Sequence, residues 1–450
     1  MNRRWYSVAL LLGAPVAGLW VGCGDDEVFR DTDAGSFDAG PGIETGPVTD
    51  PDGGDSAVPS NCGSSAGAPQ RILISMNNTA TSELAAFNIG TKAVDGRFGY
   101  DGGLGQSSSA GPDPYVVEQK NDVVARMNAQ RPWEPISTWS VLGDDLKDGG
   151  DPNAQPIGIV VPSCAKGYVL RFNRNKIAVI DTTVVADGGA ASSYLDLSPL
   201  LQPNDKDGLV EMTSAYYVAS KKLIYVLLGN YDRTKIAVDG YTALCADTKA
   251  TVIAIDAVTG QLASLGGTAP GGGIALDGYN PALSAPMVYD AARERLLVLH
   301  GGCNTDTGGG VAGPVTKRIV EEVDLATAKA KTLLTLNDKG FPGSMVLMDG
   351  NRAALTFFFP NQTFFWNPAA TTLGPEVPGS FDFASHDGKG NLVGARRTAV
   401  DAGGLVEILS APYTAGDGGT IDAAAVQTLG SNPFTNNNGF LGGIEVWPRP

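Results

Sequence analysis

The chain has 450 residues, of which 59 are Gly and 28 are Pro, so we expect a large core joined by many short turns. The 48 acidic residues outnumber the 32 basic ones, and the net charge of −16 argues against a nucleic-acid partner, which needs clustered Lys and Arg. Only two histidines are present, and this scarcity of the commonest general base near neutral pH counts against an enzyme.

The first 22 residues have the pattern of an export signal. Arg3 and Arg4 precede an apolar stretch that Pro15 interrupts, so the segment is too short for a membrane-spanning helix. Its end, Val21–Cys23, resembles a bacterial lipobox, in which the cysteine carries lipid and becomes the mature N-terminus. We therefore predict lipidation of Cys23. Ordinary signal cleavage nearby, with Cys23 left as a free thiol, is the alternative.

The next segment, residues 23–60, is rich in Asp, Gly and Pro and has Arg30 as its only base. It holds too few large apolar residues to offset the entropy of ordering it. We expect a signal peptide at 1–22, a disordered acidic tether at 23–60 and a folded domain at 61–450. Because Gly24 follows the cysteine where Asp would retain a lipoprotein in the inner membrane, we expect a cell-envelope location that favours the outer membrane.

One pattern recurs after the tether: an apolar run, a short polar turn, a second apolar run, a variable loop, and a third run that ends at Asp or Asn. Such short β-branched or aromatic runs between turns are typical of strands. Repeats of roughly forty to fifty residues built from them indicate a β-propeller. The clearest copies begin at Ile157, Ser214 and Pro286, and weaker copies begin at Tyr115, Ser344 and Phe381.

The first and last strands predict how the ring closes. Arg71–Met76 and Glu83–Lys92 supply the second and third strands of a first blade that lacks a strand in front of them. Gly439–Trp447 is a surplus strand at the other end of the chain. We therefore predict an all-β propeller of about seven four-stranded blades, closed by the C-terminal strand joining the first blade.

Three stretches resemble known propeller families. Tyr168–Thr182 (YVLRFNRNKIAVIDT) is similar to the strand–turn–strand unit of YncE-like seven-bladed propellers, and Asp196–Met212 resembles a segment of exported members of that group. Met287–Gly302 (MVYDAARERLLVLHGG) resembles a kelch-type blade, in which paired glycines end the second strand. These resemblances imply a propeller fold in families with many binding proteins, and they transfer no catalytic residue.

The best candidate for a metal site is the loop that carries Asp205, Asp207 and Glu211. Alternating aspartates followed by Gly resemble the start of an EF-hand loop, but Glu211 comes too early for the chelating twelfth position. We weigh a Ca²⁺ site there against a solvated acidic loop, and we expect no other cofactor. His300 is interpreted as a structural residue at a strand end, and His386 as part of a turn.

The other four cysteines predict two disulfides, for which three connectivities exist. Cys245 and Cys303 fall in second-to-third-strand loops of neighbouring blades, which places them on one face of the ring. Cys164 falls in a first-to-second-strand turn on the opposite face, and Cys62 lies close to that face. We therefore predict the pairs Cys245–Cys303 and Cys62–Cys164.

The leading functional hypothesis is a lipid-anchored, non-catalytic binding or scaffold module of the cell envelope. Its ligand, an unknown protein, glycan or small molecule, would sit at the loop-rich face or in the channel, and membrane contact would come through the lipid alone. One alternative is an exported lactonase-like hydrolase with a divalent metal in the channel. Another is a carbohydrate-binding propeller that uses the aromatic run Phe357–Trp366, which we interpret first as two packed strands.

Overall fold

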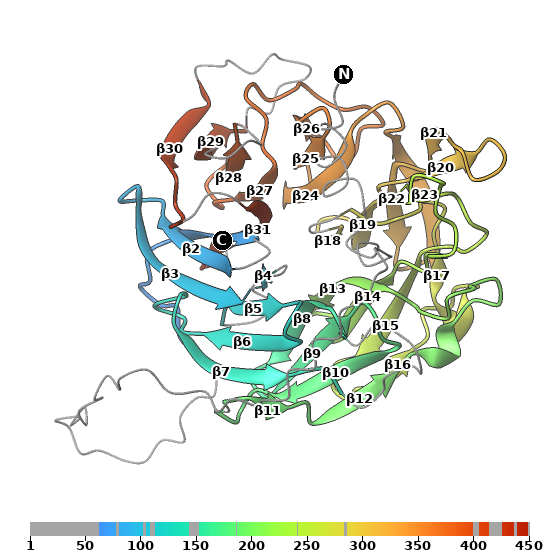
Figure 1. Cartoon of the computed structure of the whole chain (residues 1–450), viewed down its shortest axis with the longest axis horizontal. Helices are drawn as coiled ribbons and strands as arrows, with labels where there is room; N and C mark the ends of the chain where they lie inside the picture. Colours follow the sequence, from blue (N-terminus) through green and yellow to red (C-terminus); the bar gives the residue numbers. More distant parts are fainter. Residues whose placement is uncertain are drawn as a thin grey trace, which may run out of the picture.

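Seven β-sheet blades surround a central axis in the computed structural model (Figure 1). The structure describes residues 63–77, 81–101, 105–108, 113–143, 153–185, 187–240, 242–282, 286–398, 405–413, 425–435 and 439–448. The predicted all-β propeller and its seven blades are confirmed. The predicted signal peptide, the tether and Cys62 lie outside the described residues.

The blades follow one another around the ring in chain order, and each runs from an inner to an outer strand (Figure 1). Blade 1 contains β31 (Phe440–Trp447), β1 (Arg71–Asn77), β2 (Thr81–Asn88) and β3 (Ala93–Asp101). Blade 2 contains β4 (Gly105–Ser108), β5 (Tyr115–Glu118), β6 (Val123–Met127) and β7 (Pro135–Ser140), with β11 (Gly189–Ala190) at its outer edge. Blade 3 contains β8 (Pro156–Ser163), β9 (Lys166–Arg171), β10 (Lys176–Asp181) and β12 (Ser193–Asp196).

The second half of the ring repeats this order. Blade 4 contains β13 (Met212–Val218), β14 (Leu223–Leu228), β15 (Thr251–Asp256) and β16 (Leu262–Ala263), and β17 (Ile274–Ala275) also pairs with β15. Blade 5 contains β18 (Met287–Asp290), β19 (Arg295–Leu299), β22 (Ile319–Asp324) and β23 (Lys329–Thr335). Blade 6 contains β24 (Phe341–Asp349), β25 (Arg352–Phe358) and β26 (Gln362–Trp366), and blade 7 contains β27 (Phe383–His386), β28 (Asn391–Arg397), β29 (Val406–Pro412) and β30 (Gln427–Ser431).

The ring closes where the sequence predicts it. β31 pairs antiparallel with β1, with Arg71 opposite Trp447 and Asn77 opposite Phe440. The C-terminal strand is therefore the inner strand of the N-terminal blade. All seven residues of β1 are buried, since neighbouring strands and blades cover both faces of this strand.

The predicted strand order of blade 2 is wrong by one position. The apolar run at Tyr115 was expected to be the first strand of its blade, but β4 precedes it in the sheet and makes β5 the second strand. β4 has the sequence GQSS, which contains no apolar residue and gives no periodicity signal. The polar turn between β5 and β6 therefore joins a second strand to a third one.

The core lies between the blades. Val218 and Leu227 of blade 4, for example, belong to one buried cluster with Met287 and Val298 of blade 5. Burial on both sides explains why the middle strands are continuous apolar runs. The Asp at the end of a third strand has a local role: in blade 4, Asp256 Oδ1 accepts hydrogen bonds from the N–H groups of the next turn.

The two faces of the disc carry different connections. We call the face with the second-to-third-strand loops after β14 and β19 the Cys245 face, because Cys245 and Cys303 lie in those loops. We call the opposite face the Cys164 face, because Cys164 lies in the turn between β8 and β9.

Candidate functional site

The predicted disulfide between Cys245 and Cys303 is present. The two Cα atoms lie 5.0 Å apart, and the residues are separated by 58 positions in the sequence. Cys245 comes from the long loop after β14 in blade 4, and Cys303 begins β20 (Cys303–Asp306) after β19 in blade 5. The crosslink therefore confirms that these loops lie on the same face of adjacent blades.

The crosslinked loops form a small sheet of their own. β20 pairs antiparallel with β21 (Ala312–Thr316), Leu244 bridges Asn304 in parallel, and Ile236 bridges Ala243. We call this unit, residues 235–240, 242–245 and 303–316, the stapled arm. Since it combines backbone pairing with a disulfide, it is an ordered projection of the Cys245 face.

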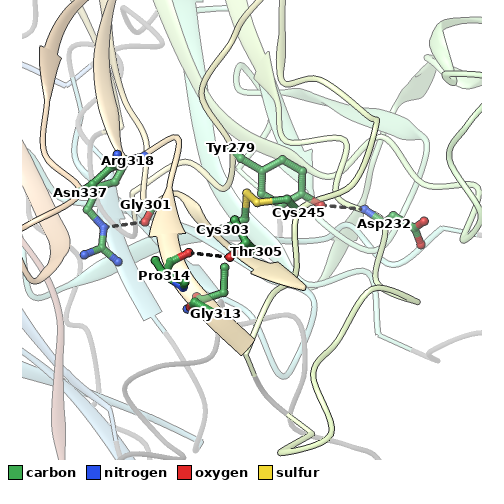
Figure 2. Close-up of a disulfide and its surroundings, with 11 residues drawn as sticks. Asp232, Cys245, Tyr279, Gly301, Cys303, Thr305, Gly313, Pro314, Arg318 and Asn337 are labelled. Atoms are coloured by element: carbon green, nitrogen blue, oxygen red, sulfur yellow. Dashed lines mark hydrogen bonds between the residues drawn. A yellow bond between two sulfur atoms is a disulfide. The ribbon is translucent and has the colours of Figure 1, made fainter. Parts of the chain in front are cut away.

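The aromatic ring of Tyr279 lies beside the disulfide (Figure 2). Tyr279, Cys303 and Phe172 are buried in one cluster, together with Tyr231. Tyr279 Oη accepts a hydrogen bond from Asp232 N at 3.3 Å, as the dashed line in Figure 2 shows. The base of the arm is thus tied to the loop between blades 4 and 5.

The structure brings the three predicted metal ligands together. Asp205, Asp207 and Glu211 lie on the Cys245 face in the loop between β12 and β13, and one carboxylate oxygen of each lies within 4.8 Å of the others. Glu211 is fully buried. The loop follows a short 3₁₀ turn (Ser198–Leu200) and leads into a strand, so it has no EF-hand architecture.

An arginine that the sequence gives no reason to single out completes this acidic cluster. Arg233 Nε donates to Glu211 Oε1 at 3.1 Å, and the Arg233 backbone N–H donates to Asp207 Oδ2 at 2.9 Å. Arg233 Nη1 also donates to Asn173 Oδ1 at 2.9 Å, and the guanidinium lies 4.7 Å from the centre of the Phe172 ring. Arg233 therefore connects the loops of blades 3 and 4 just before the stapled arm.

Two carboxyl groups of the cluster, those of Asp205 and Glu211, hold protons more tightly than usual. Burial, followed by the charge of Asp207, raises the pKa of Asp205 to about 7. Burial raises the pKa of Glu211 well above its ordinary value despite the opposing charge of Arg233, and Asp207 and Asp205 raise it further. The guanidinium of Arg233 contacts the carboxylates of Glu211 and Asp207, at 3.1 and 3.9 Å, in a partly desolvated site.

This donor set fits a hard cation. All three candidate ligands are carboxylates, and Asp205 Oδ2 is buried and accepts no hydrogen bond. Ca²⁺ prefers oxygen ligands and would compensate the charge that the single arginine leaves. Asp205 and Asp207 would hold the ion, whereas Glu211 would have to share its oxygens between the ion and Arg233.

His300 also lies on this face, but it belongs to a different cluster. Its side chain is fully buried, and its Nε2 lies 3.0 Å from Oε2 of the equally buried Glu321. The Glu321 carboxylate also accepts the N–H groups of Asp277 and Gly278 at 3.0 and 2.8 Å. Burial alone would raise the pKa of Glu321, but the nearby His300 and those N–H groups hold it below its ordinary value. His386 is the last residue of β27, directly before a turn.

The second predicted disulfide, Cys62–Cys164, includes Cys62, which lies outside the described residues. Cys164 is disulfide-bonded, and its carbonyl accepts a hydrogen bond from Thr182 Oγ1 at 2.9 Å. The carboxylate of Asp113 accepts hydrogen bonds from the backbone N–H of Gly63 and from Nε of Arg126. Nη1 of Arg126 in turn donates to the carbonyl oxygen of Thr182. These contacts place Gly63, the residue after Cys62, on the same face as the turn of Cys164, and the pair Cys62–Cys164 stays a prediction.

The aromatic run Phe357–Trp366 contains the last two residues of β25 and all of β26, so it lies in two packed strands as its first interpretation predicted. Phe357, Phe365 and Trp366 are buried, and of the aromatic residues in this run only Phe359 is exposed. A stacking platform for sugars needs several exposed rings. This run does not provide one.

No protein-family model and no curated protein sequence matches the chain. Among solved structures, a 6-phosphogluconolactonase candidate from Bacteroides fragilis superposes with a TM-score of 0.50 at 11% identity, over 85% of this chain and 99% of that one. A functionally unknown protein from Desulfotomaculum acetoxidans gives a TM-score of 0.51 at 10% identity, over 85% of this chain and 100% of that one. At these identities the likeness shows the propeller fold alone.

Within the described ranges, no helix is long and apolar enough to cross a bilayer.

Proposed function

We propose that this protein is a lipid-anchored, non-catalytic binding propeller of the cell envelope, and that its Cys245 face binds the ligand. The observation that carries the proposal is the separation of the two faces. The described chain begins at Gly63, which contacts Asp113 beside the Cys164 face, whereas the stapled arm rises from the opposite face. A lipid at Cys23 would therefore be joined to the domain on the side opposite the arm, which leaves the arm accessible to a partner.

The arm is built for presenting a surface. Its disulfide and backbone pairing hold two long loops in one conformation, so a partner would meet them already ordered. At its outer end Val238 is 76% exposed and Val311 is 51% exposed, beside Gly-rich turns. A rigid, loop-rich face of this kind suits recognition of an extracytoplasmic protein, glycan or small molecule.

Membrane fractionation of the Cys23→Ser variant tests the anchor. We expect the native chain in the detergent phase, and the variant in the aqueous phase or unprocessed, because a serine cannot carry the lipid. Ser36→Ala, another change in the same segment, is the matched control and should behave like the native protein. An unchanged membrane association of Cys23→Ser would refute the lipid anchor.

The binding face is tested separately with a photo-crosslinking side chain at Lys235 of the arm or at Lys222 of the Cys164 face, both exposed. Crosslinks to one discrete envelope component from position 235, and not from position 222, are expected. Crosslinks of that component from position 222 alone would place recognition on the wrong face and refute the assignment.

The second candidate function is a metal-dependent hydrolase of the lactonase class. The observation that favours it is the acidic cluster of Asp205, Asp207 and Glu211, whose oxygens are close enough to hold one divalent cation. Lactone hydrolysis that disappears with EDTA and returns with Ca²⁺ would support this candidate. The same lactone hydrolysis should be lost in the Asp205→Asn variant, which tests whether this residue holds the metal.

A further inference from the structure

Exposed apolar side chains gather on the Cys164 face around the turn that contains Cys164. Val184 and Val185 are 51% and 78% exposed, and Val258 is 69% exposed. Ala165, in the turn itself, is also exposed. We call these four residues the valine patch. Exposed apolar residues that gather in one place mark an interaction surface more often than scattered ones do.

Two contacts place the loops of the patch on either side of that turn. The N–H group of Thr182, in the loop that leads to the first two valines, donates to Ala165 O at 3.3 Å. On the other side, Gly260 lies so close to Lys166 that an added Cβ would be 3.8 Å from Lys166 Nζ, and Val258 belongs to the same turn as Gly260. The patch therefore spans blades 3 and 4.

The described chain begins beside this patch. Thr182 O accepts a hydrogen bond from Arg126 at 3.1 Å, and the Asp113 carboxylate links Arg126 to the backbone N–H of Gly63. The segment before Gly63 leads back to the predicted lipidation site. The patch thus lies on the side of the domain that faces the anchor.

We propose that the valine patch docks on the surface of the bilayer that holds the Cys23 lipid, so that the Cys164 face rests on the membrane. This inference rests on the lipid anchor of the proposed function. It assigns the domain an orientation that the anchor alone does not impose, because about forty residues separate Cys23 from Gly63 and a fully extended chain of that length reaches roughly 130 Å.

The small size of the patch is consistent with a contact that depends on the anchor. Four short side chains bury too little area to hold a protein on a bilayer by themselves. If the segment before Gly63 is the tether that the sequence predicts, its average end-to-end distance of about 35 Å would keep the patch at an effective concentration near the millimolar range. Weak affinity is then sufficient for frequent contact.

Charge around the patch is balanced. Lys166 and Lys222 lie in the first-to-second-strand turns, and Asp181 and Asp256 end the third strands beside them. Because both signs are present, apolar insertion rather than attraction to anionic headgroups has to supply the contact. We therefore expect docking on zwitterionic vesicles as well as on anionic ones.

The test uses the full lipidated chain with single tryptophans added at exposed valines. Val185→Trp and Val258→Trp place a fluorophore in the patch, and Val238→Trp on the stapled arm is the matched control, since Val238 is as exposed as Val185 but lies on the other face. Each variant is mixed with vesicles of brominated phosphatidylcholine, whose bromine atoms quench only rings that enter the bilayer. The fluorescence of the native chain is subtracted.

Quenching of Val185→Trp and Val258→Trp without quenching of Val238→Trp is the expected result. Proteins that float with the vesicles but show no quenching in the patch would overturn the docking proposal and leave the anchor intact. Quenching of Val238→Trp alone would overturn it in favour of the opposite orientation. Loss of flotation would remove the anchor itself and this proposal with it. A patch signal that changes only when envelope proteins are added would show a protein occupant and refute the membrane one.

Discussion

Two buried glutamates on the Cys245 face, one blade apart, have opposite electrostatic environments. Glu321 accepts two backbone N–H groups and lies against His300, and its pKa falls below the ordinary value. Glu211 accepts one backbone N–H and one Arg233 hydrogen bond, but Asp205 and Asp207 lie beside it, and its pKa rises well above the ordinary value. Burial raises the pKa of both carboxyl groups. At Glu321 the nearby His300 and the two N–H groups outweigh that effect, whereas at Glu211 the charge of Arg233 does not.

The contrast suggests different roles. Each carboxylate oxygen of Glu321 accepts a hydrogen bond from a backbone N–H of the Asp277–Gly278 loop. A buried anion that is satisfied in this way has a structural role, because it holds that loop in place. The Glu211 cluster keeps an excess of negative charge that a proton or a cation can relieve. The first region should therefore contribute stability as it stands, and the second should respond to what is bound.

The largest expected change in unfolding free energy comes from removing the Cys245–Cys303 disulfide. The double variant Cys245→Ser, Cys303→Ser should lose about 4 kcal/mol of unfolding free energy in the chain-entropy description, less any relaxation of the native state. Urea unfolding measures this loss, and hydrogen exchange of the stapled arm shows where order is lost. An unchanged unfolding free energy would mean that backbone pairing alone holds the arm.

Replacing each glutamate by its amide tests the comparison directly. Glu321→Gln should cost about 2–4 kcal/mol, since it removes a buried anion from donors that remain in place. Glu211→Gln should cost less than about 1 kcal/mol without added metal, because it also removes repulsion from Asp205 and Asp207. Urea unfolding at neutral pH ranks the two variants. A larger loss for Glu211→Gln would contradict the assignment of roles.

Calcium should stabilise one region only. If the cluster binds Ca²⁺, a tenfold excess of the ion over its Kd should add about 1.4 kcal/mol and raise Tm by a few degrees. Asp205→Asn should abolish this rise, whereas Glu321→Gln should keep it despite its lower starting Tm. Differential scanning fluorimetry with Ca²⁺, Mg²⁺ and EDTA gives the answer. Equal rises in all variants would place the ion elsewhere.

The two regions should also show opposite pH dependences of their unfolding free energy. Asp205 has a folded pKa of about 7, above its unfolded value, so its contribution to stability is present below about pH 4 and is lost as the pH rises to about 7. Glu321 has a lowered folded pKa, so its contribution is present at neutral pH and is lost as the pH falls below its ordinary range. Asp205→Asn should remove the first slope and Glu321→Gln the second, in unfolding measured from about pH 2 to 8.

Periodicity and turn residues were enough to predict most strands, the closure by Gly439–Trp447 and the Cys245–Cys303 pair. These features depend on local pattern and on the geometric rules of a closed ring. β4 was missed because its four residues are small or polar. Arg233 and Glu321 were missed for another reason: each acquires its role from a loop of a neighbouring blade, and no spacing in a single sequence shows which loops meet across blades.

The pairing of β31 with β1 also determines when folding can finish. β1 is wholly buried in the finished ring, yet its inner edge has no partner until β31, Phe440–Trp447, is available. Until then, an apolar strand with unpaired backbone groups is open to pairing with other chains. A chain that lost its final ten residues would therefore keep six of its blades and still behave as an aggregation-prone protein.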